Sequence, residues 1–244
     1  MLRASLGVLS AIAFMNAASA LPPTDSLVAP AGYENAPAPS NNSIPFSWSS
    51  TRYQQIYGAA DLQEAVGQLI TSVAFRVAED DGFDGDFAGG FVYADFSIDV
   101  SETPVAVENI GLDLDANHGP NRTTVFSGNY VVPALEGDLL VNPFDLRFVF
   151  QTPFLYSGGN LLVDFKRAKA EAPLPNLDAV VALDTVKRAY NDTLGIGAPR
   201  SDDTLGLITQ FEFRDVPEPA AGLMLPSLGV MFWGLFRRLR AGQK

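Results

Sequence analysis

The sequence contains no cysteine and only one histidine, His118. Without cysteine the chain has no disulfides, no catalytic thiol, no iron–sulfur cluster and no cysteine-ligated zinc site. A single histidine argues against a metal site built from several histidines and against a Ser-His-Asp catalytic site. We expect His118 to be a turn residue without a site of its own. Stability must therefore come from apolar burial, for which 17 phenylalanines provide material.

Basic residues are also scarce, with 16 Lys and Arg against 28 Asp and Glu, a formal net charge of −12. Five of the basic residues and one acidic residue lie in the end segments, which leaves 11 basic and 27 acidic residues in 21–215. Such a surface repels phosphate backbones, so we expect no nucleic-acid partner. The charge suits a solvated extracellular protein or a binder of divalent cations.

The N-terminal 20 residues have the three parts of a secretory signal peptide. Arg3 supplies the basic region, an apolar run follows from Leu6 to Phe14, and Ala18-Ser19-Ala20 forms an A-x-A site. The apolar run is too short for an uncleaved membrane anchor. We therefore predict export and cleavage by signal peptidase after Ala20, with Ala18 and Ala20 as the small residues that the peptidase requires.

The C-terminal segment, 216–244, combines a short motif, an apolar stretch and a basic cluster. Pro217, Glu218 and Pro219 precede an uncharged stretch over 220–236. Its 17 residues are close to the minimum for a membrane-spanning helix. Arginines in the tail 237–244 would stay on the cytoplasmic side and hold the chain in the inner membrane, with the preceding domain outside. These membrane-stop residues are Arg237, Arg238 and Arg240.

This arrangement resembles the PEP-CTERM sorting signal, in which a Pro-Glu-Pro motif, one membrane span and a short basic tail accompany an N-terminal signal peptide. The resemblance covers about 29 residues of tail. It implies recognition by an exosortase, a membrane-embedded cysteine transpeptidase-like enzyme of Gram-negative bacteria. That enzyme would cut near the motif and leave the domain at the cell surface or outside the cell. The family usually accompanies exopolysaccharide and biofilm systems.

Between the ends, composition separates a lead-in from a domain. Residues 21–51 are rich in Pro, Ala, Ser and Asn, a composition typical of an extended segment that does not pack. Residues 52–215 are long enough for one large all-β domain. A short helix is predicted over 59–68.

The domain shows apolar side chains at every second position, as in Phe144, Leu146, Phe148 and Phe150. Such alternation places one strand face on a core and the other in water, as in antiparallel sheets. We predict an antiparallel β-sandwich, with a jelly roll as one topology of that class. The alternating segments are 91–100, 144–150, 161–166 and 207–214, and further strands are expected at 70–77, 105–112, 123–132 and 184–190.

The domain is also similar to an uncharacterised domain of other PEP-CTERM proteins, a resemblance that implies no particular role. The similar stretches are 52–57, 123–128, 152–156, 159–164 and 206–213.

Two acidic loops are candidates for calcium. In the first, Asp113, Asp115 and Asn117 alternate ahead of a glycine, and alternate oxygen ligands in a tight turn suit Ca²⁺. It departs from an EF-hand because Thr124 occupies the place of the bidentate glutamate. The other loop contains Glu79, Asp80, Asp81, Asp84 and Asp86. The alternative is a pair of solvated acidic loops without a metal, and no other cofactor is expected.

Aromatic side chains near predicted loops could form a sugar-binding platform, although most aromatics are expected in the core. The platform candidates are Trp48, Tyr53, Tyr57 and Tyr156. No nucleophile or metal motif indicates catalysis, so we do not expect an enzyme. The sequence favours an exported surface or matrix protein with a structural or interaction domain that meets exopolysaccharide. The alternative is a dedicated carbohydrate-binding or calcium-dependent adhesion module.

Overall fold

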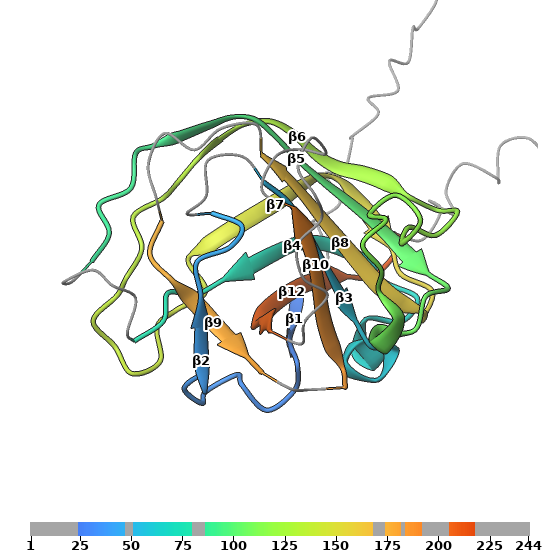
Figure 1. The fold of residues 1–244 in the computed structure, drawn as a ribbon, viewed down its shortest axis with the longest axis horizontal. Coiled ribbons are helices and arrows are strands. Elements are labelled where there is room, and N and C mark those ends of the chain that lie inside the picture. The colour runs from blue at the N-terminus through green and yellow to red at the C-terminus, as the bar shows by residue number, and fades with distance from the viewer. Residues whose placement is uncertain are drawn as a thin grey trace, which may run out of the picture.

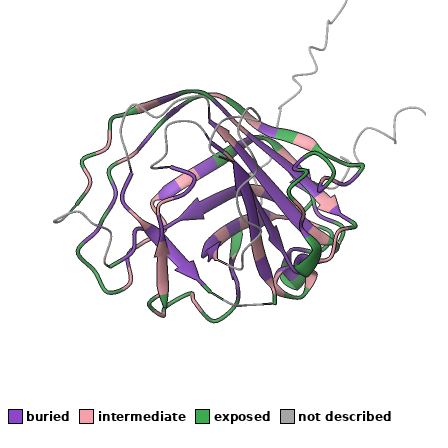
Figure 2. Ribbon diagram, in the orientation of Figure 1, coloured by how far each residue is buried: buried purple, intermediate pink, exposed green. Residues whose placement is uncertain are grey.

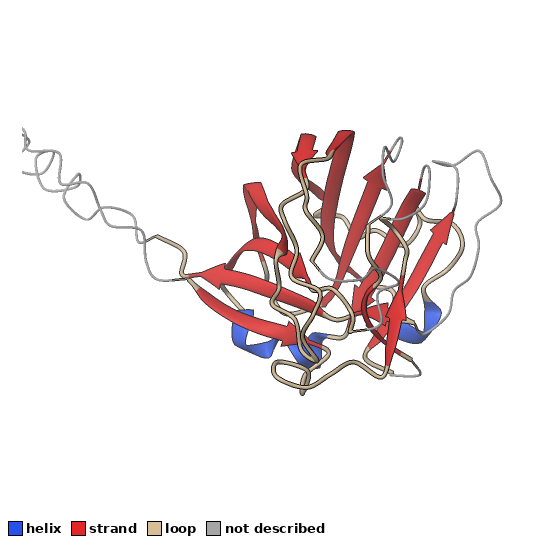
Figure 3. Ribbon diagram, turned by 90° about the vertical axis from the view of Figure 1, so that its left-hand side faces the viewer, coloured by secondary structure: helices blue, strands red, loops and turns tan. Residues whose placement is uncertain are grey.

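A computed structural model describes residues 24–46, 51–79, 86–167, 174–181, 184–191 and 205–217. These residues form antiparallel sheets with little helix (Figures 1 and 3). A four-stranded and a five-stranded sheet pack face to face, and a smaller three-stranded sheet lies at one side. The predicted all-β sandwich is confirmed.

The four-stranded sheet has the order β1-β12-β4-β7, so the first and last strands of the described residues pair with each other. Both neighbours of β4, the strands β12 and β7, pair with it in antiparallel register. The strands are β1 (Asp25–Ala29), β4 (Leu69–Phe75), β7 (Leu146–Leu155) and β12 (Thr209–Arg214).

The five-stranded sheet has the order β10-β3-β8-β5-β6, with β8 at its centre. Its strands are β3 (Thr51–Tyr57), β5 (Val92–Thr103), β6 (Thr123–Val131), β8 (Asn160–Arg167) and β10 (Val186–Asn191). The three-stranded sheet, of order β11-β9-β2, is built from β2 (Ser40–Asn42), β9 (Leu177–Val180) and β11 (Gly206–Leu207).

The core lies between the two large sheets, where the inward positions of each strand meet (Figure 2). Phe148 of β7 stacks on Phe96 of β5, with ring centroids 5.1 Å apart, and Tyr57 of β3 meets Phe211 of β12 edge to face. Period-two alternation therefore identified the inward face correctly. Burial of large aromatic rings such as these contributes strongly to the stability of the core.

The lead-in prediction was wrong in one respect, because residues 24–46 do pack. The strand β1 pairs with β12, and β2 pairs with β9. Val28, Ile44 and Phe46 are buried in the main core.

A second correction concerns 105–112, which forms no strand. It contains a single 3-10 turn, η2 (Val107–Asn109), inside a long loop. The other predicted strands are present, and the predicted helix at 59–68 is the 3-10 turn η1 (Ala59–Ala65).

Candidate functional site

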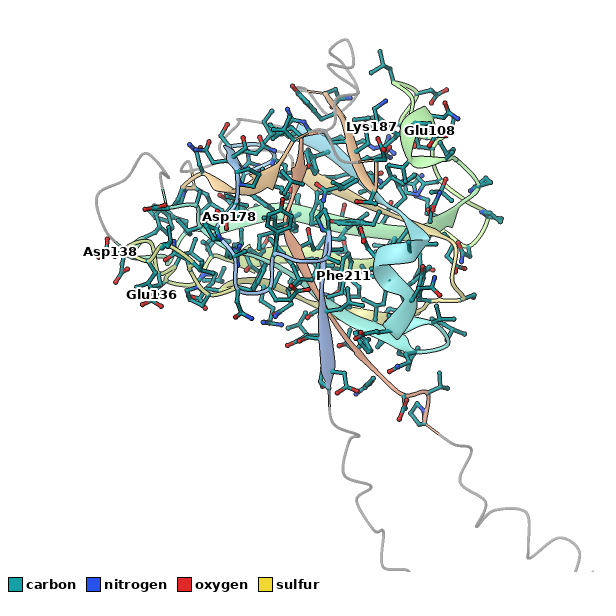
Figure 4. All side chains as sticks on the ribbon, turned by 90° about the horizontal axis from the view of Figure 1, so that it is seen from below. Glu108, Glu136, Asp138, Asp178, Lys187 and Phe211 are labelled. Carbon is teal, nitrogen blue, oxygen red and sulfur yellow. The ribbon has the colours of Figure 1, made fainter. Side chains whose placement is uncertain are left out.

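The loop that joins β5 to β6, residues 104–122, folds over the outer face of the five-stranded sheet. Its apolar side chains make a second small core with outward residues of the strands. This core consists of Ile56, Val107, Ile110, Leu114, Leu162 and Ala189. On β10, Lys187 donates to the carbonyl oxygen of Glu108 and ties η2 to the sheet edge (Figure 4). The loop thus turns a sheet face that would otherwise be solvated into a covered one.

Beside this small core lies a group of charged and polar side chains, which we call the outer polar cluster. Strands β3, β8 and β5 are neighbours, and their register sets Asp164 of β8 between Gln54 and Asp99. Side chains two residues apart on one strand share a face, so each strand contributes a pair. The cluster consists of Arg52, Gln54, Asp99, Ser101, Asp164 and Lys166 from the strands, and Asp115, His118 and Arg122 from the loop.

Asp164 is the centre of the cluster, and its side chain is fully buried. Its Oδ2 accepts from Nη2 of Arg52 at 2.7 Å, from Nε2 of Gln54 at 3.0 Å and from the His118 ring at 2.9 Å. Burial alone would raise the pKa of Asp164, but the hydrogen bonds from His118 and Arg52 outweigh it, so the pKa is lowered. The carboxylate is therefore ionised and held on several sides.

Asp99 occupies a similar position one strand away. Its Oδ2 accepts from Nη2 of Arg122 at 2.6 Å and from Nζ of Lys166 at 2.7 Å, while Oδ1 accepts from the Thr124 hydroxyl at 2.7 Å. Burial opposes ionisation here too, yet these hydrogen bonds hold the pKa of Asp99 well below its usual range. Three carboxylates, Asp99, Asp115 and Asp164, face three cations, Arg52, Arg122 and Lys166. The net charge of the cluster is therefore close to zero.

His118 links Asp164 to a serine hydroxyl. One ring nitrogen, Nε2, lies 2.9 Å from Asp164, and the other, Nδ1, lies 2.9 Å from Oγ of Ser101. The sequence reasoning assigned His118 no site, so it missed this Ser-His-Asp chain of hydrogen bonds. Ser101 is fully buried and its Oγ also accepts from the backbone N–H of Gly119. A nucleophile must contact its substrate, and this hydroxyl is enclosed.

The same residues include a metal-like grouping, since Asp99, His118 and Asp164 offer ligand atoms within 4.8 Å of one another. However, each carboxylate already contacts cationic side chains, Arg52 on Asp164 and Arg122 with Lys166 on Asp99. A metal ion would have to displace those cations. The arrangement is that of an ion-pair network that fastens the loop to the sheet.

Acid should weaken this network. The pKa values of Asp99, Asp164 and Asp115 are all lowered in the folded chain, the last chiefly by its hydrogen bond from Arg52. A lowered folded-state pKa gives stability that is present above the unfolded value of about 4 and is lost as the pH falls. Asp178, whose pKa is raised by burial, changes stability in the opposite direction. With three groups against one, we expect the urea midpoint to be steady from pH 7 to 5 and to fall below about pH 4. A midpoint that stays level down to pH 3 would contradict this prediction.

The three residues of the predicted calcium site lie close in the chain, but each already has hydrogen-bond partners. Oδ1 of Asp113 accepts from the backbone N–H groups of Asp115 and Ala116. Oδ1 of Asp115 contacts Arg52 and Arg122, and the buried Asn117 amide bonds Gln54 and the backbone of Gly111. Calcium binding at this loop stays a prediction. The ion would have to displace the hydrogen-bond donors that now contact these side-chain oxygens.

Of the other residues singled out in the sequence, some are described in the structure and some lie outside the described residues. Glu79 is exposed, and Asp86 accepts from the backbone N–H of Gly137. The tyrosines proposed for a sugar platform, Tyr53, Tyr57 and Tyr156, are buried, so that platform is not formed by them. Outside the described residues lie Ala18, Ala20, Trp48, Asp80, Asp81, Asp84, Glu218, Pro219, Arg237, Arg238 and Arg240.

Pro217 is described and exposed, three residues beyond the end of β12. In the part of the chain that the structure covers, none of the helical turns has the length and apolar character needed to cross a bilayer. Comparison of the chain with protein-family models, with curated proteins and with solved structures gives no match.

Proposed function

We propose that the chain is an exported, exosortase-sorted protein of the cell surface or extracellular matrix, with a non-catalytic interaction domain that associates with exopolysaccharide. The proposal rests on the order of signal peptide, Pro-Glu-Pro motif, apolar span and arginine cluster in the sequence. One structural observation supports it. The motif begins at Pro217, where the chain has left the sandwich and residues 215–217 are exposed, so a processing enzyme could reach it.

The outer polar cluster supports a non-catalytic role. It has the residue types of an active site, but its carboxylates are paired with cations and its serine is enclosed. In this proposal the cluster holds the loop 104–122 on the sheet, because each of its carboxylates already contacts a cationic side chain. The strand orders 1-12-4-7 and 3-8-5-6, with the chain crossing between the sheets, support a jelly roll with β10 added at one edge.

During export and sorting, the partners of the chain would be signal peptidase, the inner membrane through residues 220–236, and an exosortase. The chain would be held in the inner membrane before processing and would then reach the surface or the medium. The acidic surface of the domain would exclude nucleic acid as a partner.

Replacement of Pro217, Glu218 and Pro219 by alanine should leave export intact and block sorting. The apolar span and its arginines still stop the chain in the membrane, because moving arginines across costs several kcal/mol. The two prolines keep the segment extended, the form that a protease cleft accepts. The variant should accumulate in the membrane fraction, about 3 kDa heavier than the processed protein. The measurement is fractionation and mass spectrometry in a strain with an active exosortase.

A matched control replaces Asp215 with alanine, which leaves the motif and the span unchanged. This variant should be processed like the wild type. If the motif variant has the same mass and location as the wild type, the tail is only an anchor and the sorting proposal fails.

A further inference from the structure

Arg167, the last residue of β8, is a buried cation that forms no ion pair with a carboxylate among the described residues. Its exposed fraction is 1%, and it lies on the inward face of the strand, two residues beyond the core residue Phe165. Its guanidinium carbon is 4.9 Å from the centre of the Tyr93 ring. The buried Arg76, by contrast, forms an ion pair with Asp178. The charge of Arg167 is thus enclosed without a counter-charge.

The guanidinium of Arg167 is satisfied on one side only. Nη1 donates to the carbonyl oxygen of Phe46, which also accepts from the Tyr93 hydroxyl at 3.3 Å. Nε and Nη2 are buried and have no hydrogen-bond partner. These two N–H groups form one edge of a planar fork, so both point toward the same acceptor position. Buried donors are normally bonded, and an open pair on a buried cation indicates a missing acceptor.

Thr51 of β3 adds a third open group beside this edge. Thr51 and Arg167 are direct partners in the antiparallel pair β3–β8, two neighbouring strands of the five-stranded sheet (Figure 1). Their side chains therefore share the inward face, with Cβ atoms about 4.5–5.5 Å apart. Thr51 is fully buried, and its Oγ1 has no hydrogen-bond partner either. Three open atoms from two adjacent side chains can donate to one acceptor.

Charge and space decide what that acceptor is. Burial lowers the pKa of Arg167, but arginine starts above about 12, so the guanidinium stays protonated at neutral pH. A water molecule would accept the hydrogen bonds and leave the charge uncompensated, whereas an anion does both. All three atoms are shielded from solvent, so the space suits a monatomic ion better than phosphate or sulfate.

We propose that Arg167 and Thr51 bind a chloride ion inside the sandwich, with Nε and Nη2 of Arg167 and Oγ1 of Thr51 as the donors. The ion would neutralise the guanidinium in the way that Asp178 neutralises Arg76. It would join the end of β8 to β3 and to Phe46, whose carbonyl oxygen already accepts from the other side of the same guanidinium. The stability of the domain should therefore depend on the anion supplied.

The test is a thermal melt of the purified full chain in sodium chloride, sodium bromide and sodium gluconate at matched ionic strength. At ten times the Kd, chloride and bromide should raise the melting temperature by about 3–6 °C in a saturable way, and gluconate should not. Arg167→Met should abolish the rise. In gluconate this variant should melt no lower than the wild type, since it removes an uncompensated buried charge. Arg147→Met is the matched control, because that arginine is partly exposed and already pairs with Glu212, and it should respond to chloride like the wild type.

Substitutions of Thr51 test the third donor. Thr51→Val keeps the shape and removes the hydroxyl, so chloride affinity should fall by about two- to tenfold, whereas Thr51→Ser should keep it. If Arg167→Met fails to fold, this pair decides. A rise that is equal in gluconate, or that persists unchanged in Arg167→Met or in Thr51→Val, would overturn the proposal.

Bromide also locates the ion directly. A crystal of the full chain grown in sodium bromide should show an anomalous-scattering peak in contact with Nε and Nη2 of Arg167. No peak at that position, or no saturable rise for the wild type in chloride, would mean that the open donors hold only water, and the proposal fails.

Discussion

Asp164→Asn should lower the free energy of unfolding by about 3–5 kcal/mol, the cost of removing one partner from a buried ion pair. The buried Asp164 carboxylate accepts from Arg52, Gln54 and His118 at once, and asparagine removes its charge and replaces one of its two acceptor oxygens with an NH2 donor. Asparagine has nearly the same shape, so no cavity forms and the loss reports charge and hydrogen bonding alone. Arg52 would then be largely buried without its main counter-charge.

Urea denaturation measures this loss as a lower midpoint at an unchanged slope. Asp113→Asn is the matched control, since that exposed side chain accepts only from its own turn and asparagine can do the same. The control should stay within about 0.5 kcal/mol of the wild type. A midpoint for Asp164→Asn that equals that of the control would show that the outer polar cluster adds nothing to stability.

The sandwich could be predicted because alternation along a strand reports which side chains face the core. In β8, Leu161, Val163 and Phe165 point inward as predicted. Alternation does not reveal what covers the other face. Leu162 and Asp164 point outward but are buried, because the loop 104–122 covers them. A leucine on the polar face of β8 was the one local sign of that cover.

The sequence predicts a strand over 105–112, but the segment forms none. In the fold, Val107 and Ile110 pack onto the small core with Ile56 and Leu162 through a 3-10 turn, whereas Leu112 is exposed. Composition also gave a wrong prediction for the lead-in, residues 21–51, which was expected not to pack. Proline is disfavoured inside central strands but is tolerated on edge strands, as Pro153 in β7 shows, and beyond strand ends, where β1 stops at Ala29 directly before Pro30. A proline-rich segment can therefore contain short paired strands.

The outer polar cluster could not be predicted from spacing. His118 and Asp164 are 46 residues apart, and Arg52 and Asp164 are 112 apart. Only the strand order β3-β8-β5 brings them together. The acidic residues of the loop suggested calcium because sequence shows their charge but not their arginine partners. Long-range pairing thus decides whether a carboxylate is a ligand or half of an ion pair.

Gly119→Ala should detach the loop 104–122 from the sheet. Gly119 is buried next to His118, and an added Cβ would lie 1.6 Å from the carbonyl oxygen of Glu102 and 2.8 Å from its carbon. The obstacle is backbone of β5, which cannot rotate away as a side chain could. The loop must shift, and the contacts of His118 with Ser101 and Asp164 would break. We expect a loss of about 3 kcal/mol, at the upper end of the range for overpacking.

Gly111→Ala is the matched control within the same loop, because its Cβ would meet only the Asn117 side chain, at an ordinary 3.7 Å. Neither glycine has a positive φ, so steric contact alone separates the two variants. Alanine at the unstrained position restricts the unfolded chain and should be neutral or stabilising by up to about 1 kcal/mol. The two substitutions are therefore expected to act in opposite directions. Limited proteolysis with mass mapping should find cuts within 104–122 only in Gly119→Ala, since cleavage follows the population of the opened loop. Equal stability and equal protection in the two variants would mean that this loop is not held against the sheet by the close approach of Gly119 to β5.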